Sequence, residues 1–282
     1  MYRKTLVGAL SAIPLLFAGF AAWVYLASEN HLRSFAPPPP FVLDIPEDEQ
    51  SIERGRHIAL TRGCAGCHGK DLAGQVMWGS AVAPNLPAMA RDQSAATMEA
   101  AIRHAIGVDG RALYSMPSYN FLRLRDEDVA DLVAYFRSMP VIEKDLPSAS
   151  LPWTIRLDIA RGLDAAIPEF LHLVPPLKGA ELGSEALARG EYLAMTTCNE
   201  CHGFSLRADT PWGDAAPDLI IVSAYDEQAF RALMKTGVAL GDRELEMMSG
   251  VARSRFAHFT DDEVSDLYAF LRDMSARAIA GN

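Results

Sequence analysis

Cysteine is scarce in this chain, at four among 282 residues, and basic residues are outnumbered by acidic ones. Four cysteines are too few for the dense disulfide framework of many small secreted domains. Lys and Arg number 26 against 36 Asp and Glu, a formal net charge of -10, so a nucleic-acid backbone would be repelled. Runs of alternating strand residues are also missing. We therefore expect an all-α protein without a nucleic-acid partner.

The length suggests more than one domain, and the sequence repeats itself. A chain of 282 residues is long for one domain of about 100–200 residues. Segment 54–60 resembles 189–195, and segment 126–137 resembles 261–272, at an offset of about 135 residues. Segments 126–137 and 261–272 each have the apolar periodicity of an amphipathic helix. The chain therefore holds one small helical domain twice, and Gly55 and Gly190 are expected where the first and last helices of their repeats cross.

The N-terminal segment predicts a membrane anchor. Thr5–Ala27 has no charged side chain over 23 residues, which as a helix spans about 34 Å, enough for a hydrocarbon core of about 30 Å. A cleaved signal peptide is the alternative, but its apolar part usually has only about 7–15 residues. Arg3 and Lys4 precede the segment, which places the N-terminus in the cytoplasm and the rest of the chain across the membrane.

These features divide the chain into five segments. Four consecutive prolines at 37–40 form an extended stalk after the anchor. The connection between the repeats is too long for a bare loop and is expected to pack across both domains. The expected segments are a transmembrane anchor at 1–28, a Pro-rich stalk at 29–45, a first domain at 46–146, a connection at 147–183 and a second domain at 184–282.

All four cysteines lie in two Cys-x-x-Cys-His motifs, at 64–68 and 198–202. Two thiols one helical turn apart suit the two vinyl groups of a porphyrin, and the adjoining histidine suits its iron, so this motif indicates c-type haem attachment. A disulfide between such close thiols would be strained. A shared zinc site is a further alternative, but each motif has its own repeat. Two covalent haem c groups are therefore expected, held by Cys64, Cys67, His68, Cys198, Cys201 and His202.

Both repeats resemble class I cytochrome c domains, over 52–140 and 184–276. The pair is similar to the membrane-anchored dihaem cytochrome c subunits of periplasmic dehydrogenases. The resemblance implies two tandem cytochrome c-like helical domains after one N-terminal transmembrane helix, on the periplasmic side of a single-pass inner-membrane protein. It also implies that His68 and His202 are iron ligands.

The resemblance further implies a partner for each imidazole and a second iron ligand for each haem. The carbonyls of Pro84 and Pro217 would accept the second imidazole N–H. Met116, 48 residues after His68, stands where such domains place the methionine ligand. In the second repeat Met247 and Met248 are both candidates for this ligand, and Met248 fits the family's ligand loop better. His104 and His258 are alternatives that would give bis-histidine iron.

Two six-coordinate haems in neighbouring domains suggest an electron relay. It would connect a dehydrogenase or quinol-oxidising partner with an acceptor such as an oxidase or soluble cytochrome. Residues 41–146 carry 11 basic and 15 acidic side chains, a charge of -4, and residues 179–282 carry 9 and 17, a charge of -8. The second domain is therefore expected to meet a positively charged partner. A dihaem enzyme, peroxidase-like or acting on sulfur compounds, is the alternative to a non-catalytic electron-transfer subunit.

Overall fold

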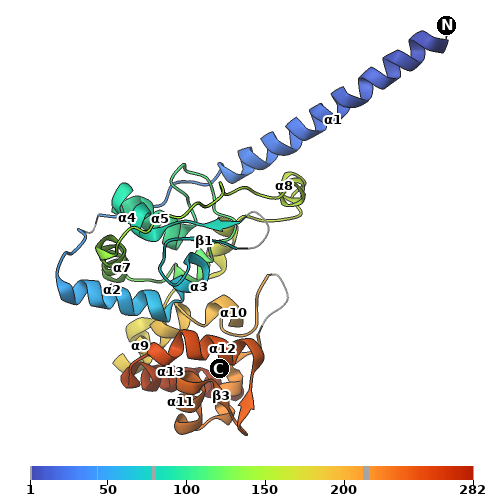
Figure 1. The fold of residues 1–282 in the computed structure, drawn as a ribbon. Coiled ribbons are helices and arrows are strands. Elements are labelled where there is room, and N and C mark those ends of the chain that lie inside the picture. The colour runs from blue at the N-terminus through green and yellow to red at the C-terminus, as the bar shows by residue number, and fades with distance from the viewer. Residues whose placement is uncertain (1, 43, 78–80, 212–215, 282) are drawn as a thin grey trace.

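The computed structural model describes residues 2–42, 44–77, 81–211 and 216–281, with the backbone alone described for residues 2–13. Helices dominate these residues, and two short antiparallel strand pairs are the only sheets among them. A long N-terminal helix projects from a body in which the two repeats lie against each other (Figure 1). The expectation of a mostly helical protein is confirmed.

Helix α1 (Tyr2–Leu32) is held at its C-terminal end by α8 (Trp153–Ala160). The buried Arg156 of α8 donates to Ser28 Oγ at 3.0 Å and to Glu29 Oε1 at 3.0 Å. Across the part of the chain that the structure describes, no helix has the length and hydropathy needed to span a membrane. The side chains of residues 5–13, which form the first part of the expected span, lie outside the described residues.

The first repeat is built on two crossing helices, α2 (Glu49–Thr61) and α7 (Asp126–Ser138). Asp48 caps α2 by accepting the N–H of Ser51 at 2.9 Å. Arg54 of α2 binds Asp131 of α7 at 2.6 Å. The other elements of this repeat are α3 (Cys64–His68), β1 (Gln75–Val76), β2 (Val82–Ala83), α4 (Leu86–Asp92), α5 (Ala95–His104) and α6 (Ser118–Phe121).

The second repeat has the same plan, with α9 (Glu185–Met195) crossing α13 (Asp261–Ala280). Arg189 binds Asp266 at 2.6 Å, as Arg54 binds Asp131. Thr260 and Glu263 form a capping box at the start of α13. The other elements are α10 (Asn199–His202), η3 (Leu219–Ala224), α11 (Glu227–Thr236), β3 (Val238–Ala239), β4 (Arg243–Glu244), α12 (Glu246–Ser254) and η4 (Phe256–His258).

The helix crossings require glycine. A Cβ atom on Gly55 would lie 2.0 Å from the Asp131 carbonyl oxygen, and one on Gly190 would lie 2.1 Å from the Asp266 carbonyl oxygen. Both distances are far below van der Waals contact, so any larger residue would push the two helices apart. The expected positions of Gly55 and Gly190 at the two crossings are both confirmed.

The connection between the repeats packs on both of them, as expected. Its segment η1 (Ile167–Leu173) contacts α6 of the first repeat, and η2 (Gly179–Leu182) contacts α9 of the second. Arg123 of the first repeat donates to the carbonyl of Pro175 at 2.8 Å. The connection thus joins the repeats through contacts on both sides as well as through its covalent continuity.

Candidate functional site

Each Cys-x-x-Cys-His motif forms one short helical turn that glycine ends. Gly63 (φ +76°) precedes α3 and Gly69 (φ +83°) follows it, while Gly203 (φ +90°) follows α10. These are left-handed or otherwise unusual backbone conformations that glycine adopts without steric cost. None of the four cysteines forms a disulfide in the structure, which describes all four. The turn brings two thiols and an imidazole of each motif close together.

Both histidines of the motifs are buried and hold a defined orientation. Nδ1 of His68 lies 2.9 Å from the carbonyl oxygen of Pro84, and Nδ1 of His202 lies 2.7 Å from that of Pro217. A carbonyl only accepts hydrogen bonds, so Nδ1 donates and Nε2 is the nitrogen left for a metal. Burial lowers the pKa of both imidazoles more than the carbonyls raise it. The neutral form that binds iron is therefore favoured.

The first cysteine of each motif is poorly suited to act as a free thiolate. Burial raises the pKa of Cys64 and of Cys198 to about 11, so both stay protonated at neutral pH. Disulfide exchange uses the thiolate, so it is disfavoured at both cysteines. Among the described residues, no group of three or more His, Cys, Asp or Glu side chains is placed to hold a metal ion.

The first site is an apolar cavity onto which the expected haem-binding residues converge. Cys64, Cys67, His68 and Met116 all line it. Two thiols, an imidazole with Nε2 available and a thioether form the donor set of a c-type haem with histidine and methionine ligation. These residues therefore fit the group. The apolar part of the wall consists of Leu86, Ile102, Pro117, Phe121, Leu124, Leu132 and Phe136.

The second site distinguishes its two candidate methionines by burial. Met248 is half-buried and packs against the core cluster that contains Cys198, whereas Met247 is 74% exposed. Met248 lies in the first turn of α12, while Met116 precedes α6. The position of Met248 on the core side agrees with the choice of Met248 over Met247. Both methionine assignments remain predictions.

The alternative histidine ligands have other surroundings. Nε2 of His104 lies 3.0 Å from a carboxylate oxygen of Glu99. The His104 side chain does not line the first cavity. His258 closes η4 and precedes the buried Phe259. The contact of His104 gives its ring a structural role.

Three charged residues line the first cavity that the sequence did not single out, namely Arg62, Glu200 and Arg255. Glu200 and Arg255 belong to the second repeat, so the first site is completed by side chains of its neighbour. Glu200 stands inside the second motif, so the sequence alone places it near the second attachment site. Its closeness to the first site depends on how the repeats dock, which the sequence pattern does not contain.

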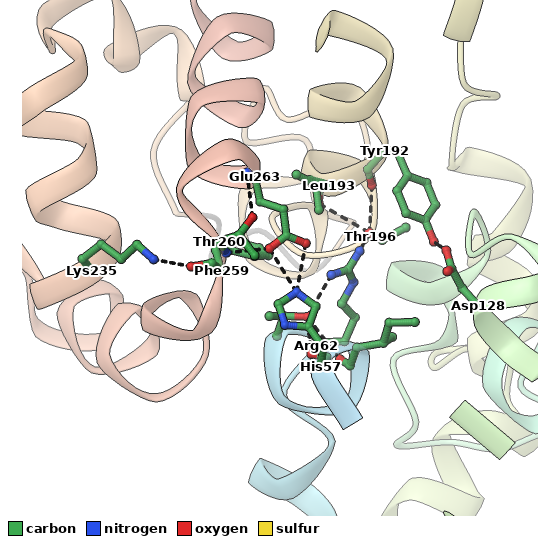
Figure 2. Close-up of polar contacts among 12 residues, drawn as sticks. His57, Arg62, Asp128, Tyr192, Leu193, Thr196, Lys235, Phe259, Thr260 and Glu263 are labelled. Atoms are coloured by element: carbon green, nitrogen blue, oxygen red, sulfur yellow. Dashed lines mark hydrogen bonds and ion pairs between the residues drawn. The ribbon is translucent and has the colours of Figure 1, made fainter. Parts of the chain in front are cut away.

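The repeats dock through reciprocal polar contacts (Figure 2). His57 of α2 binds Glu263 of α13 at 2.9 Å. Tyr192, the residue of α9 equivalent to His57, donates to Asp128 of α7, the residue equivalent to Glu263. Contacts that are exchanged in this way are typical of two copies related by a two-fold axis.

Close to this pseudo-two-fold axis lie the residues that lead into the motifs. Arg62 and Thr196 each stand two positions before the first cysteine of their motif, and Arg62 donates to Thr196 Oγ1 at 2.9 Å. Both side chains are buried. The axis therefore brings the attachment ends of the two motifs toward each other.

Comparison with known proteins agrees with this geometry. The family model described as Cytochrome c matches residues 52–140 and 187–275. The fructose dehydrogenase cytochrome subunit of Gluconobacter japonicus is 26% identical over 95% of this chain and 61% of its own length. The gluconate 2-dehydrogenase cytochrome c subunit of Pantoea cypripedii is 23% identical over 80% of this chain and 60% of its own length.

A third relative has a similar name and coverage. The cytochrome c subunit of the quinone alcohol dehydrogenase of Gluconobacter oxydans is 24% identical over 81% of this chain and 56% of its own length. The chain therefore matches about 56–61% of the length of these three relatives. All three relatives are named as cytochrome subunits of a dehydrogenase.

Proposed function

Because this chain belongs to the cytochrome c family, we propose that it is the electron-transfer subunit of a dehydrogenase complex. It carries two covalently attached haem c groups, one in each repeat, and transfers electrons through them. In the proposed role it takes electrons from a catalytic dehydrogenase subunit, or from another quinol-oxidising partner, and passes them to an oxidase or a soluble cytochrome. The names of the three relatives support the dehydrogenase as donor.

One observation carries the electron-transfer role at the level of the site. His68 and Met116 line one apolar cavity together with the attachment cysteines. His68 and Met116 would hold the iron of this haem between them, which would leave no position for a substrate and would suit electron exchange. The comparisons do not favour the alternative of a dihaem enzyme, because the matched relatives are named as cytochrome subunits.

Spectroscopy of the purified full-length protein tests this role. We expect two haems per chain, a sulfur-to-iron charge-transfer band from both in the oxidised state, and no binding of carbon monoxide after reduction. Purification from membranes through this chain is expected to bring a dehydrogenase subunit with it. Carbon monoxide binding at either haem would instead indicate an open iron and favour the enzyme.

We further propose that α1 anchors the protein in the inner membrane and that the haem domains lie in the periplasm. The uncharged segment 5–27 is long enough for a span. The described large apolar side chains of α1 up to Leu26 are mostly exposed, which suits lipid contact; they include Leu15, Leu16, Phe17, Phe20 and Leu26.

Deleting residues 2–22 tests the anchor, with haem attachment ensured by an added cleavable export signal. The shortened protein should move from the membrane fraction to the soluble fraction while it keeps both haems. Retention in the membrane after washing with high salt would show that another surface holds it. A control with Trp153→Ala on α8, exposed by 44%, should stay in the membrane.

A further inference from the structure

An ion pair of the second repeat lies against the haem site of the first. Nη1 of Arg255 lies 2.7 Å from Oε2 of Glu200, and the two side chains are only 20% and 24% exposed. Both residues line the cavity that holds Cys64, Cys67 and His68. The contact is close enough that a Cβ atom on Gly63 would lie 2.0 Å from Nε of Arg255. Glycine beside Cys64 thus makes room for this guanidinium.

One partner of the pair also belongs to the second attachment motif. Glu200 stands between Cys198 and Cys201 in the sequence, so the ion pair connects that motif with the wall of the first cavity. Burial lowers the pKa of the Arg255 guanidinium, but the attraction of Glu200 outweighs burial and the pKa is raised. Arg255 therefore keeps its positive charge in a partly buried place between the two motifs.

The pseudo-two-fold axis shows that this pair has no counterpart on the other side. When the last helices of the repeats are aligned, Arg255 is equivalent to Asn120. When the two Cys-x-x-Cys-His motifs are aligned, Glu200 is equivalent to Gly66. Asn120 is fully buried, and Gly66 has no side chain that could carry a charge. An uncharged amide and a glycine therefore stand where the second repeat has a cation and an anion.

We propose that Arg255 and Glu200 form a charge pair that sets the reduction potentials of the two haems and makes them unequal. This inference rests on the proposed electron relay. A positive charge near a haem favours the reduced state, which carries one positive charge less, and a negative charge favours the oxidised state. A partly buried charge acts more strongly than a solvated one because the surrounding dielectric screens it less.

The test compares the reduction potentials of full-length variants by spectroelectrochemical titration. Arg255→Met should lower the sum of the two potentials, and Glu200→Gln should raise it. Each change should alter the reduction equilibrium constant of at least one haem by about three- to tenfold, or roughly 30–60 mV for a one-electron couple. The double variant should return toward the wild-type values, and Arg255→Lys should stay close to them.

Arg253 provides a matched control. It lies in the last turn of α12, the helix that Arg255 caps. It pairs with Glu244 at 3.0 Å, but its side chain is 48% exposed and does not line the first cavity. Arg253→Met should leave both potentials unchanged. Shifts of the same sign in Arg255→Met and Glu200→Gln, or no shift beyond that of Arg253→Met, would overturn the proposal.

Two further measurements keep the outcomes separate. Haem content and unfolding midpoints identify a variant whose reduction potential changed because its cavity loosened. If Arg255→Met folds poorly, Arg255→Lys and Glu200→Gln still test the proposal. Carbon monoxide binding by the wild-type protein would overturn the proposed carrier role. Even then, the titration would show whether Arg255→Met and Glu200→Gln shift the reduction potentials in opposite directions.

Discussion

Nε2 of His57 lies 2.9 Å from Oε1 of Glu263 and joins the opening helix of the first repeat to the closing helix of the second. Tyr192 and Asp128 make the equivalent contact in the opposite direction. The two domains thus bind each other with the same two helix surfaces. The first haem site consequently includes residues from both repeats.

The contact between His57 and Glu263 should make stability depend on acid pH. Burial raises the pKa of the Glu263 carboxyl, but hydrogen bonds from His57 and from the N–H of Thr260 outweigh burial and hold the pKa below its ordinary value of 4.5. A group with a lowered pKa stabilises the folded state above its unfolded pKa, and this contribution is lost as pH falls through the folded value.

Glu263→Gln should therefore be less stable than the wild type near pH 7, with the difference shrinking as the pH falls below about 4.5. Thermal unfolding of both proteins between pH 3 and 7 measures this. Two curves that stay parallel across the range would contradict a titrating role for Glu263.

The helix crossings predict a strong effect of adding one methyl group. Gly55→Ala and Gly190→Ala should each lower the free energy of unfolding by about 2–3 kcal/mol, because the new Cβ would overlap a backbone carbonyl of the crossing helix. Gly250→Ala in α12 is the control, since a Cβ there meets nothing within 4 Å. It should be neutral or stabilising by up to about 1 kcal/mol. Chemical denaturation of the haem-loaded proteins measures all three.

The methionine assignments predict different spectra for neighbouring residues. Met116→Ala and Met248→Ala should each abolish the sulfur-to-iron charge-transfer band of one haem, lower its potential and allow carbon monoxide to bind. Met247→Ala should leave the spectrum unchanged, since its side chain is 74% exposed. Loss of the band in Met247→Ala, with retention in Met248→Ala, would reverse the assignment in the second repeat.

The acidic second domain predicts salt-dependent electron exchange. Residues 179–282 carry 9 basic and 17 acidic side chains, a charge of -8, which should attract a soluble acceptor with a positive surface. Raising the ionic strength from about 0.01 M to about 0.15 M shortens the Debye length from about 30 Å to about 8 Å. The second-order rate with a basic cytochrome should fall several-fold, as stopped-flow absorbance would show, and a rate independent of salt would count against this docking mode.

The sequence predicted the features that depend on local spacing. Covalent haem attachment needs two thiols and an imidazole within five residues, so both motifs could be identified from the sequence alone. The repeat could also be identified by comparing segments of the sequence. The helix crossing was also predictable, because glycine in an amphipathic helix points to close backbone approach. These features need no knowledge of how the domains dock.

The contacts between the domains could not be predicted in the same way. Arg255 is 55 positions after Glu200 and nearly 200 after Gly63, and only the docking of the repeats brings all three together. The bond of His57 to Glu263 depends on the same docking. For the second methionine ligand, the exposure of Met247 adds to the preference for Met248 that the sequence already gave, and the assignment stays a prediction.

The glycine crossings also bear on how two copies of a domain diverge after duplication. At positions 55 and 190 a carbonyl oxygen leaves no room for a side chain, so a change there destabilises either copy. Positions 120 and 255 are equivalent to each other, and there the copies hold Asn and Arg. At these positions the two halves of this protein agree where their own helices cross and differ beside the first cavity, which Arg255 lines.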